Sequence, residues 1–136
     1  MANFDSDYFD AVHILELGDS PSIGFAADSQ QQLETGRGWR FSICSRTVCD
    51  EQESFEVIGL WNALTTGEPA RCHTPGYAIE LVQNGEKVFT AALCWHCNNI
   101  SISGRLASIG WRNFDASSDA ARALLQFCQK SVSRNS

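Results

Sequence analysis

Basic side chains are scarce in this sequence, because 10 Lys and Arg stand against 16 Asp and Glu, with a formal net charge of −6 and a pI near 4.9. Binding to nucleic acid or to an anionic membrane requires a basic surface. We therefore expect neither among the partners of this protein. The acidity is compatible with a basic protein partner, which acidic surfaces attract, and also with a plain role in solubility.

Long apolar runs are missing as well, since no stretch approaches the roughly 20 residues that a membrane-spanning helix needs. The opening MANFDSDYFDAV lacks the basic and apolar regions of a secretory signal peptide. We therefore expect a cytoplasmic protein, in which thiols stay reduced. In such a compartment the even count of six cysteines carries little information, because a disulfide framework is expected of shorter secreted chains.

Internal repeats and low-complexity tracts are also absent, and 43% of the 136 residues are hydrophobic. This composition predicts one globular domain over 1–136, with disorder confined to the first few residues and to 133–136. The polar stretch 28–38 is predicted to be a loop or a long hairpin tip. Apolar runs bounded by turn residues predict strands over 12–17, 22–26, 39–44, 99–103 and 109–114.

Two helices are predicted from their caps and apolar spacing. Asp50 and Glu53 have the spacing of a capping box, and Gly67 is expected to stop the helix that follows them. A second helix begins after Ser117 or Ser118. Their apolar stripes are Val57, Ile58, Trp61 and Leu64 in the first, and Ala121, Leu124, Leu125, Cys128 and Val132 in the second. These elements predict an α+β class: a single-domain antiparallel sheet with about two helices packed on one face.

The clearest local signal is a hairpin, in which YAIELV and KVFTAAL flank Asn84-Gly85. Both central residues of a type I′ turn need positive φ, and this dipeptide supplies them. With these two residues as the turn, the register can be counted outward, subject to a one-residue shift at Pro75 and Gly76. The predicted pairs are Gln83–Glu86, Leu81–Val88, Ile79–Thr90, Tyr77–Ala92, Cys72–Cys97 and His73–His96.

That register gathers cysteines and histidines at the open end of the hairpin. Zinc takes Cys and His ligands tetrahedrally, and a CxxC segment supplies two thiolates. If these side chains bind a metal, we expect that metal to be zinc. Its ligands would be Cys72, Cys94 and Cys97 with His73 or His96, or the hairpin cysteines completed by Cys44 and Cys49.

Other interpretations of the same cluster stay open. Redox chemistry usually places CxxC before a helix, whereas C-W-H-C here joins two strands. A nucleophile would be Cys72 or Cys94, activated by His73 or His96. Buried free cysteine also packs as a small apolar residue, as we expect of Cys44 and Cys128. A close approach of Cys72 and Cys97 without metal would indicate a disulfide or plain packing.

A partner-binding surface is predicted from charge and aromatic side chains. Glu51, Glu53 and Glu56 form an acidic patch on the first helix, which would steer a basic partner. Tryptophan is enriched among the residues that dominate interface energies. We therefore expect the anchor to be Trp95 or Trp111, whichever is exposed.

The segment from Phe55 to Leu125 resembles small uncharacterised bacterial proteins with a helix, a Cys-x-x-Pro-x-Tyr turn, a hairpin and a Cys-aromatic-x-Cys-Asn run. The matching residues are Cys72, Pro75, Tyr77, Cys94, Trp95, Cys97 and Asn98. Some such proteins look like immunity proteins encoded beside toxins, and they lack an assigned reaction. The resemblance implies a protein partner and carries over no catalytic residue.

These observations favour a non-enzymatic cytoplasmic protein that uses no cofactor and acts by occluding a protein partner, such as a toxin or effector. The first alternative is a small zinc-binding protein built on the hairpin cysteines. The second is a cysteine-dependent enzyme.

Overall fold

The computed structural model describes residues 4–5, 9–18, 22–23, 32–34, 39–69, 75–106 and 110–134. Over these residues the chain forms two helices and an eight-stranded antiparallel sheet in the order β2-β4-β1-β5-β6-β7-β8, with β3 also paired to β4. The elements are β1 (Ala11–Leu17), β2 (Ser22–Ile23), β3 (Gln32–Glu34), β4 (Trp39–Val48), α1 (Glu51–Asn62), β5 (Tyr77–Gln83), β6 (Glu86–Cys94), β7 (Asn99–Ser103), β8 (Gly110–Asn113) and α2 (Asp119–Arg134). The predicted α+β class is confirmed.

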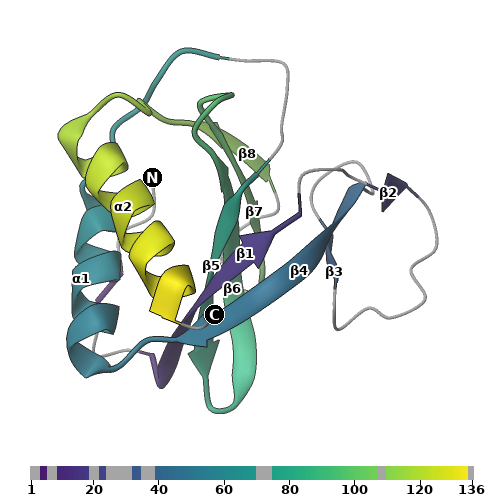
Figure 1. Ribbon diagram of the computed structural model, residues 1–136, viewed down its shortest axis with the longest axis vertical. Coiled ribbons are helices and arrows are strands. Elements are labelled where there is room, and N and C mark those ends of the chain that lie inside the picture. The colour runs from purple at the N-terminus through teal and green to yellow at the C-terminus, as the bar shows by residue number, and fades with distance from the viewer. Residues whose placement is uncertain are drawn as a thin grey trace.

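Both helices lie on one face of the sheet, called here the near face (Figure 1). Alternate residues of the central strands point toward the helices and form the main core with them. Burial of this apolar area, at roughly 25 cal/mol per Å², is the main source of stability. Core members include Ile14, Ile79, Leu81 and Phe89 from the strands and Val57, Trp61, Leu124 and Cys128 from the helices.

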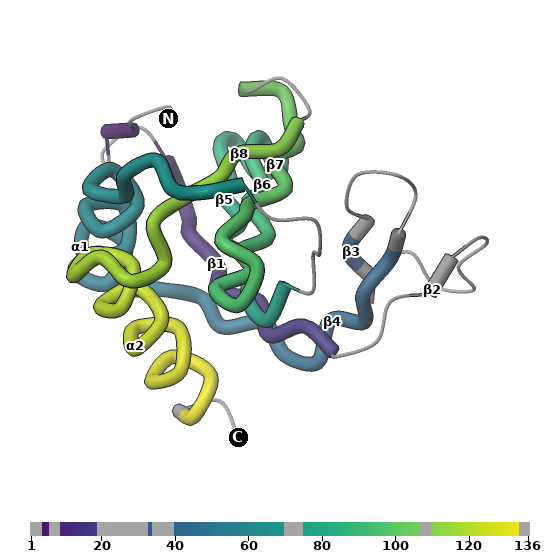
Figure 2. The backbone as a smooth tube through the Cα atoms, turned by 90° about the horizontal axis from the view of Figure 1, so that it is seen from above, coloured from purple at the N-terminus to yellow at the C-terminus, as the bar shows by residue number. Residues whose placement is uncertain are grey.

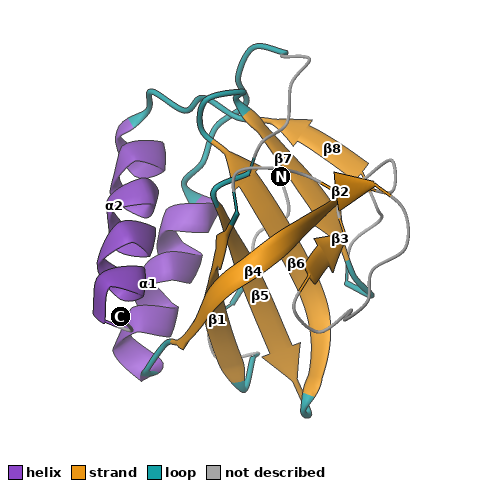
Figure 3. Ribbon diagram, turned by 45° about the vertical axis from the view of Figure 1, so that its right-hand side comes forward, coloured by secondary structure: helices purple, strands orange, loops and turns teal. Residues whose placement is uncertain are grey.

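The opposite or far face is partly covered by β4 itself. The C-terminal part of β4 pairs with β1, whereas its N-terminal part pairs with β2 and β3. Phe41 from that part is fully buried in a second cluster with Leu15, Ala78 and Ala92, whose small alanines leave room for its ring. Figure 2 shows the resulting order of helices, central strands and the β2–β3 end, and Figure 3 shows β4 crossing the sheet.

The start of α1 is confirmed and its end is corrected. Asp50 accepts a hydrogen bond from the Glu53 N–H at 2.8 Å, and the Glu53 carboxylate accepts from the Asp50 N–H at 3.0 Å, as in a capping box. The helix ends at Asn62 with Ala63 as its cap, so Gly67 does not stop it. After the helix the chain is extended at Thr66, which forms an isolated β-bridge with Phe114, next to β8.

The predicted Asn84-Gly85 turn is confirmed, with φ of 55° and 75°, and Gln83 pairs with Glu86 as expected. Farther from the turn the predicted register is wrong by one residue. A β-bulge at Val88 shifts the pairing, so the observed pairs are Leu81–Phe89, Ile79–Ala91 and Tyr77–Leu93.

The bulge arises from contacts that lie outside the hairpin. Val88 and Phe89 are consecutive, yet both are buried in the main core. The Val88 carbonyl accepts a hydrogen bond from the Leu106 N–H at 3.0 Å. Gly104 has φ of 121°, and a Cβ there would lie 2.6 Å from the Val88 oxygen. The segment after β7 therefore holds the bulge in place, and only glycine fits at position 104.

Several strand boundaries also differ from prediction. Gln32–Glu34 forms β3 inside the predicted loop 28–38. β4 continues past Cys44 to Val48, because Arg46, Thr47 and Val48 pair with β1. β6 ends at Cys94, and 95–98 form the connection to β7, so Cys97 does not extend the strand as the register count assumed.

Gly59 offers a first test of the fold. It lies on the exposed side of α1, and a Cβ built there meets no atom within 4 Å. Because alanine loses less backbone entropy in a helix, we expect Gly59→Ala to raise the free energy of unfolding by about 0.5–1 kcal/mol, measured by urea denaturation. A lower stability of the variant would contradict this placement of α1.

Candidate functional site

The cysteines of the CxxC segment lie at the connection between β6 and β7. Cys94 and Cys97 are each 1% exposed, and the Cys97 N–H donates to the Cys94 sulfur at 3.1 Å. Cys97 is disulfide-bonded, whereas Cys94 is a free thiol. Cys72 and His73 lie outside the described residues, as do the predicted pairs Cys72–Cys97 and His73–His96.

The predicted zinc site is not assembled within the described ranges. Among those residues, no group of three or more His, Cys, Asp and Glu side chains gathers as metal ligands do. The sulfur of Cys97 is held in a disulfide, and zinc binds thiolates. Since Cys72 and His73 are outside the described residues, zinc binding stays a prediction.

The other cysteines divide between surface and core. Cys44 is exposed, contrary to the prediction that it is buried, because it lies on the outward side of the strand formed by 39–48. Cys128 is fully buried in the main core, as predicted. Burial, with a smaller contribution from neighbouring Cys49, raises the pKa of the Cys128 thiol far above its ordinary value. A thiol in this state is a packing residue.

The two predicted tryptophan anchors differ in exposure. Trp95 is half-buried, donates its indole N–H to the Ala121 carbonyl at 2.8 Å, and meets Tyr77 and Phe114 edge-to-face. Trp111, on the edge strand β8, is 37% exposed. Of the two, Trp111 meets the condition of exposure better.

The three glutamates of the predicted acidic patch, Glu51, Glu53 and Glu56, do not share one surface. Glu53 serves the capping box of α1. Glu53 and Glu56 also line a groove beside α2, together with Lys130. Glu51 lines a separate groove at the first turns of α1. The acidic patch is therefore split between two surfaces.

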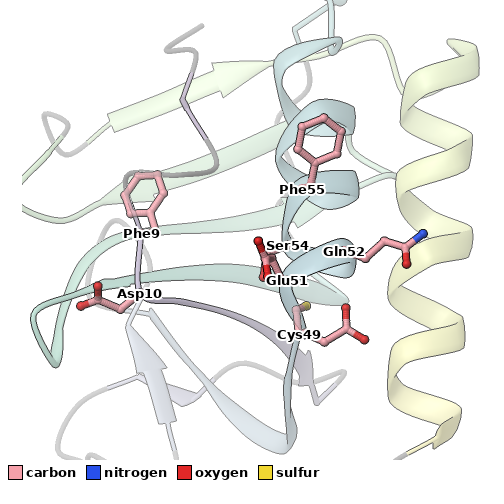
Figure 4. A pocket seen from close by; sticks show the side chains of 8 residues that line it. Phe9, Asp10, Cys49, Glu51, Gln52, Ser54 and Phe55 are labelled. Atoms are coloured by element: carbon pink, nitrogen blue, oxygen red, sulfur yellow. The ribbon is translucent and has the colours of Figure 1, made fainter.

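The groove that Glu51 lines, called here the α1 groove, lies between the segment entering β1 and the first turns of α1 (Figure 4). Its lining combines two aromatic rings and three carboxylates with a cysteine and two neutral polar residues: Phe9, Phe55, Asp10, Asp50, Glu51, Cys49, Gln52 and Ser54. Asp10 accepts from the Asn84 N–H, and Asp50 caps α1. These bonds use one oxygen of each carboxylate and hold both groups in the lining of the groove.

Phe55 is the residue that sequence reasoning missed in this groove. It is 70% exposed, the highest value among the exposed large hydrophobic residues that the structure describes. It lies one turn after Glu51, on the same side of α1. The signal was present in the sequence, because Phe55 falls off the apolar stripe of that helix.

Sequence reasoning also missed a charged cluster on the far face. Glu80 is 2% exposed, although it is ionisable. Its Oε1 lies 2.8 Å from the His13 Nδ1, its Oε2 lies 3.4 Å from the Arg46 Nη2, and Lys87 Nζ lies 3.9 Å away. The residues come from β5, β1, β4 and β6, so the strand order creates the cluster.

The cluster holds the Glu80 carboxylate in its ionised form. Burial alone raises the pKa of Glu80, but the hydrogen bond from His13 and the charges of Arg46 and Lys87 outweigh it, so the pKa lies below its ordinary value. Both carboxylate oxygens are engaged and shielded from solvent. This arrangement favours stability of the sheet rather than proton transfer to a substrate.

The comparisons with known proteins provide no relative, because no family model, curated protein or solved structure matches this chain. Within the described part of the chain, no helix is long and apolar enough to cross a membrane.

Proposed function

We propose that this protein binds a basic protein partner through the α1 groove and thereby occludes the partner's functional surface, as an immunity protein does to a toxin. The observation that carries the proposal is Phe55, exposed over 70% of its surface beside carboxylates that fixed hydrogen bonds hold in place. An exposed aromatic ring in a groove is the usual form of an interface anchor.

Charge complementarity defines the chemistry of the partner. Asp10, Asp50 and Glu51 line the same groove as Phe9 and Phe55, and the chain carries a net charge of −6. An Arg or Lys side chain can lay its apolar stem or guanidinium plane on Phe55 while its charge meets these carboxylates. A partner that presents such side chains around an active site would be blocked by the contact.

We place this binding in the cytoplasm, as the sequence led us to expect. A disulfide at Cys97 in that compartment would be transient, because cytosolic disulfides are usually catalytic or redox-sensing.

The test is co-expression with the products of the genes that neighbour its own. We expect one product to be toxic when expressed alone, growth to be restored by this protein, and the purified pair to bind. Phe55→Ala should lower the affinity by about thirtyfold, equivalent to about 2 kcal/mol, while leaving folding intact because the ring is exposed.

Trp111→Ala is the matched control, since it removes an exposed aromatic ring from a different surface. Loss of binding in Trp111→Ala but not in Phe55→Ala would move the interface to β8 and overturn the groove. The binding function itself is contradicted if no neighbouring product is toxic or binds, and if the purified protein turns over a small molecule in a manner that depends on Cys94 or Cys97.

A further inference from the structure

The CxxC segment holds a free thiol directly beside one end of a disulfide. The Cys94 sulfur accepts the Cys97 N–H at 3.1 Å, so it lies against the backbone of the bonded residue. Among the cysteines that the structure describes, Cys44, Cys94 and Cys128 are free thiols. Cys97 is the disulfide-bonded cysteine of the described part of the chain.

We propose that Cys94 and Cys97 form a thiol–disulfide exchange site. The Cys94 thiolate attacks the Cys97 sulfur, and a Cys94–Cys97 bond forms as the bond from Cys97 to its present partner breaks. The partner sulfur leaves with the electron pair and takes up the proton that Cys94 released. The number of disulfides is unchanged, so the step needs no external oxidant or reductant.

Burial makes this internal step the favoured one. Cys97 is 1% exposed, so thiols in solution have little access to its sulfur, whereas Cys94 is already inside the same shielded site. A reactant held in place has a very high effective concentration relative to a diffusing one. The connection between the strands also keeps the two cysteines close together, because only residues 95 and 96 separate them and these residues lie in a turn.

The experiment maps disulfides after acid quenching and alkylation of protein equilibrated in glutathione buffers of varied ratio. In the native chain we expect two linked peptides. One joins Cys97 to Cys72, the cysteine that the sequence pairs with it, and the other joins Cys94 to Cys97; the amounts of both should change with the glutathione ratio. In Cys72→Ser we expect a Cys94–Cys97 disulfide, with a loss of two free thiols relative to the fully reduced variant. Cys44→Ser is the control and should show both linkages, since Cys44 is free and lies on β4.

The proposal is overturned if Cys94 is alkylated completely at every glutathione ratio in the native chain. It is equally overturned if Cys94 and Cys97 both stay free in Cys72→Ser under conditions that oxidise the native chain. Both measurements detect covalent linkage between cysteines, so their outcome does not depend on whether a partner binds at the α1 groove.

Discussion

Gly67→Ala should lower the free energy of unfolding by about 3 kcal/mol and the melting temperature by roughly 10 °C. A Cβ at this position would lie 2.2 Å from the Phe114 carbonyl oxygen and 2.6 Å from the Asp115 nitrogen. These are backbone atoms, so no side-chain rotation relieves the overlap. Urea and thermal denaturation measure the effect.

The loss is large because the contact joins two connections far apart in sequence. Gly67 donates its N–H to the Asn113 carbonyl at 3.3 Å, and the Asp115 N–H donates to Thr65 at 2.9 Å. Separating these two connections to admit a methyl group breaks both bonds. Gly76→Ala is the matched control, since a Cβ there meets no atom within 4 Å. Equal stability of the two variants would contradict the contact.

Glu80→Ala should destabilise the protein by about 3 kcal/mol at neutral pH, because it leaves three basic groups facing each other without their carboxylate. Glu80→Gln should cost less, since the amide can still hydrogen-bond to His13. Glu86→Gln is the control: its pair with Arg105 is exposed on both sides, so we expect a change within about 0.5 kcal/mol.

The destabilisation by Glu80→Gln should depend on pH in a defined direction. The pKa of Glu80 is lowered in the folded state, so its stabilising effect is complete above the ordinary glutamate range, about pH 4.3, and is lost as pH falls through the folded-state value. The stability difference between native chain and variant should therefore shrink below about pH 4. A constant difference from pH 7 to pH 3 would show that charge is not its source.

Features encoded by neighbouring residues could be predicted from the sequence. Asp50 and Glu53 specify the start of α1 through bonds across one turn. Asn84-Gly85 specifies the hairpin turn, because its positive φ values are intrinsic to these residue types. The apolar stripe of α2 places Leu124 and Cys128 in the core as expected.

Features created by distant residues could not be predicted. The bulge at Val88 depends on Gly104 and Leu106, beyond the next strand. Gly67 was assigned to helix termination, although its role is the contact with Phe114.

The same limit applies to the two sites. The Glu80 cluster exists only once four strands are placed side by side, and the sequence shows it merely as one acid in an apolar strand. The α1 groove likewise brings together Asp10 and Glu51, which lie far apart in the sequence. In the sequence Glu51 and Glu56 are both acidic residues of one predicted acidic patch. The packing of α1 places them in two different grooves.

The most direct measurement of the binding proposal is therefore the affinity of the purified partner for Glu51→Gln and Phe55→Ala, with Glu56→Gln as a control of identical charge on the same helix. Glu51→Gln should weaken binding more than Glu56→Gln at low salt, and the difference should fall as salt screens it, with a Debye length of about 8 Å at physiological ionic strength. The loss in Phe55→Ala should persist at high salt, because it is apolar. Equal effects of both glutamate substitutions together with unchanged affinity of Phe55→Ala would contradict docking in the α1 groove.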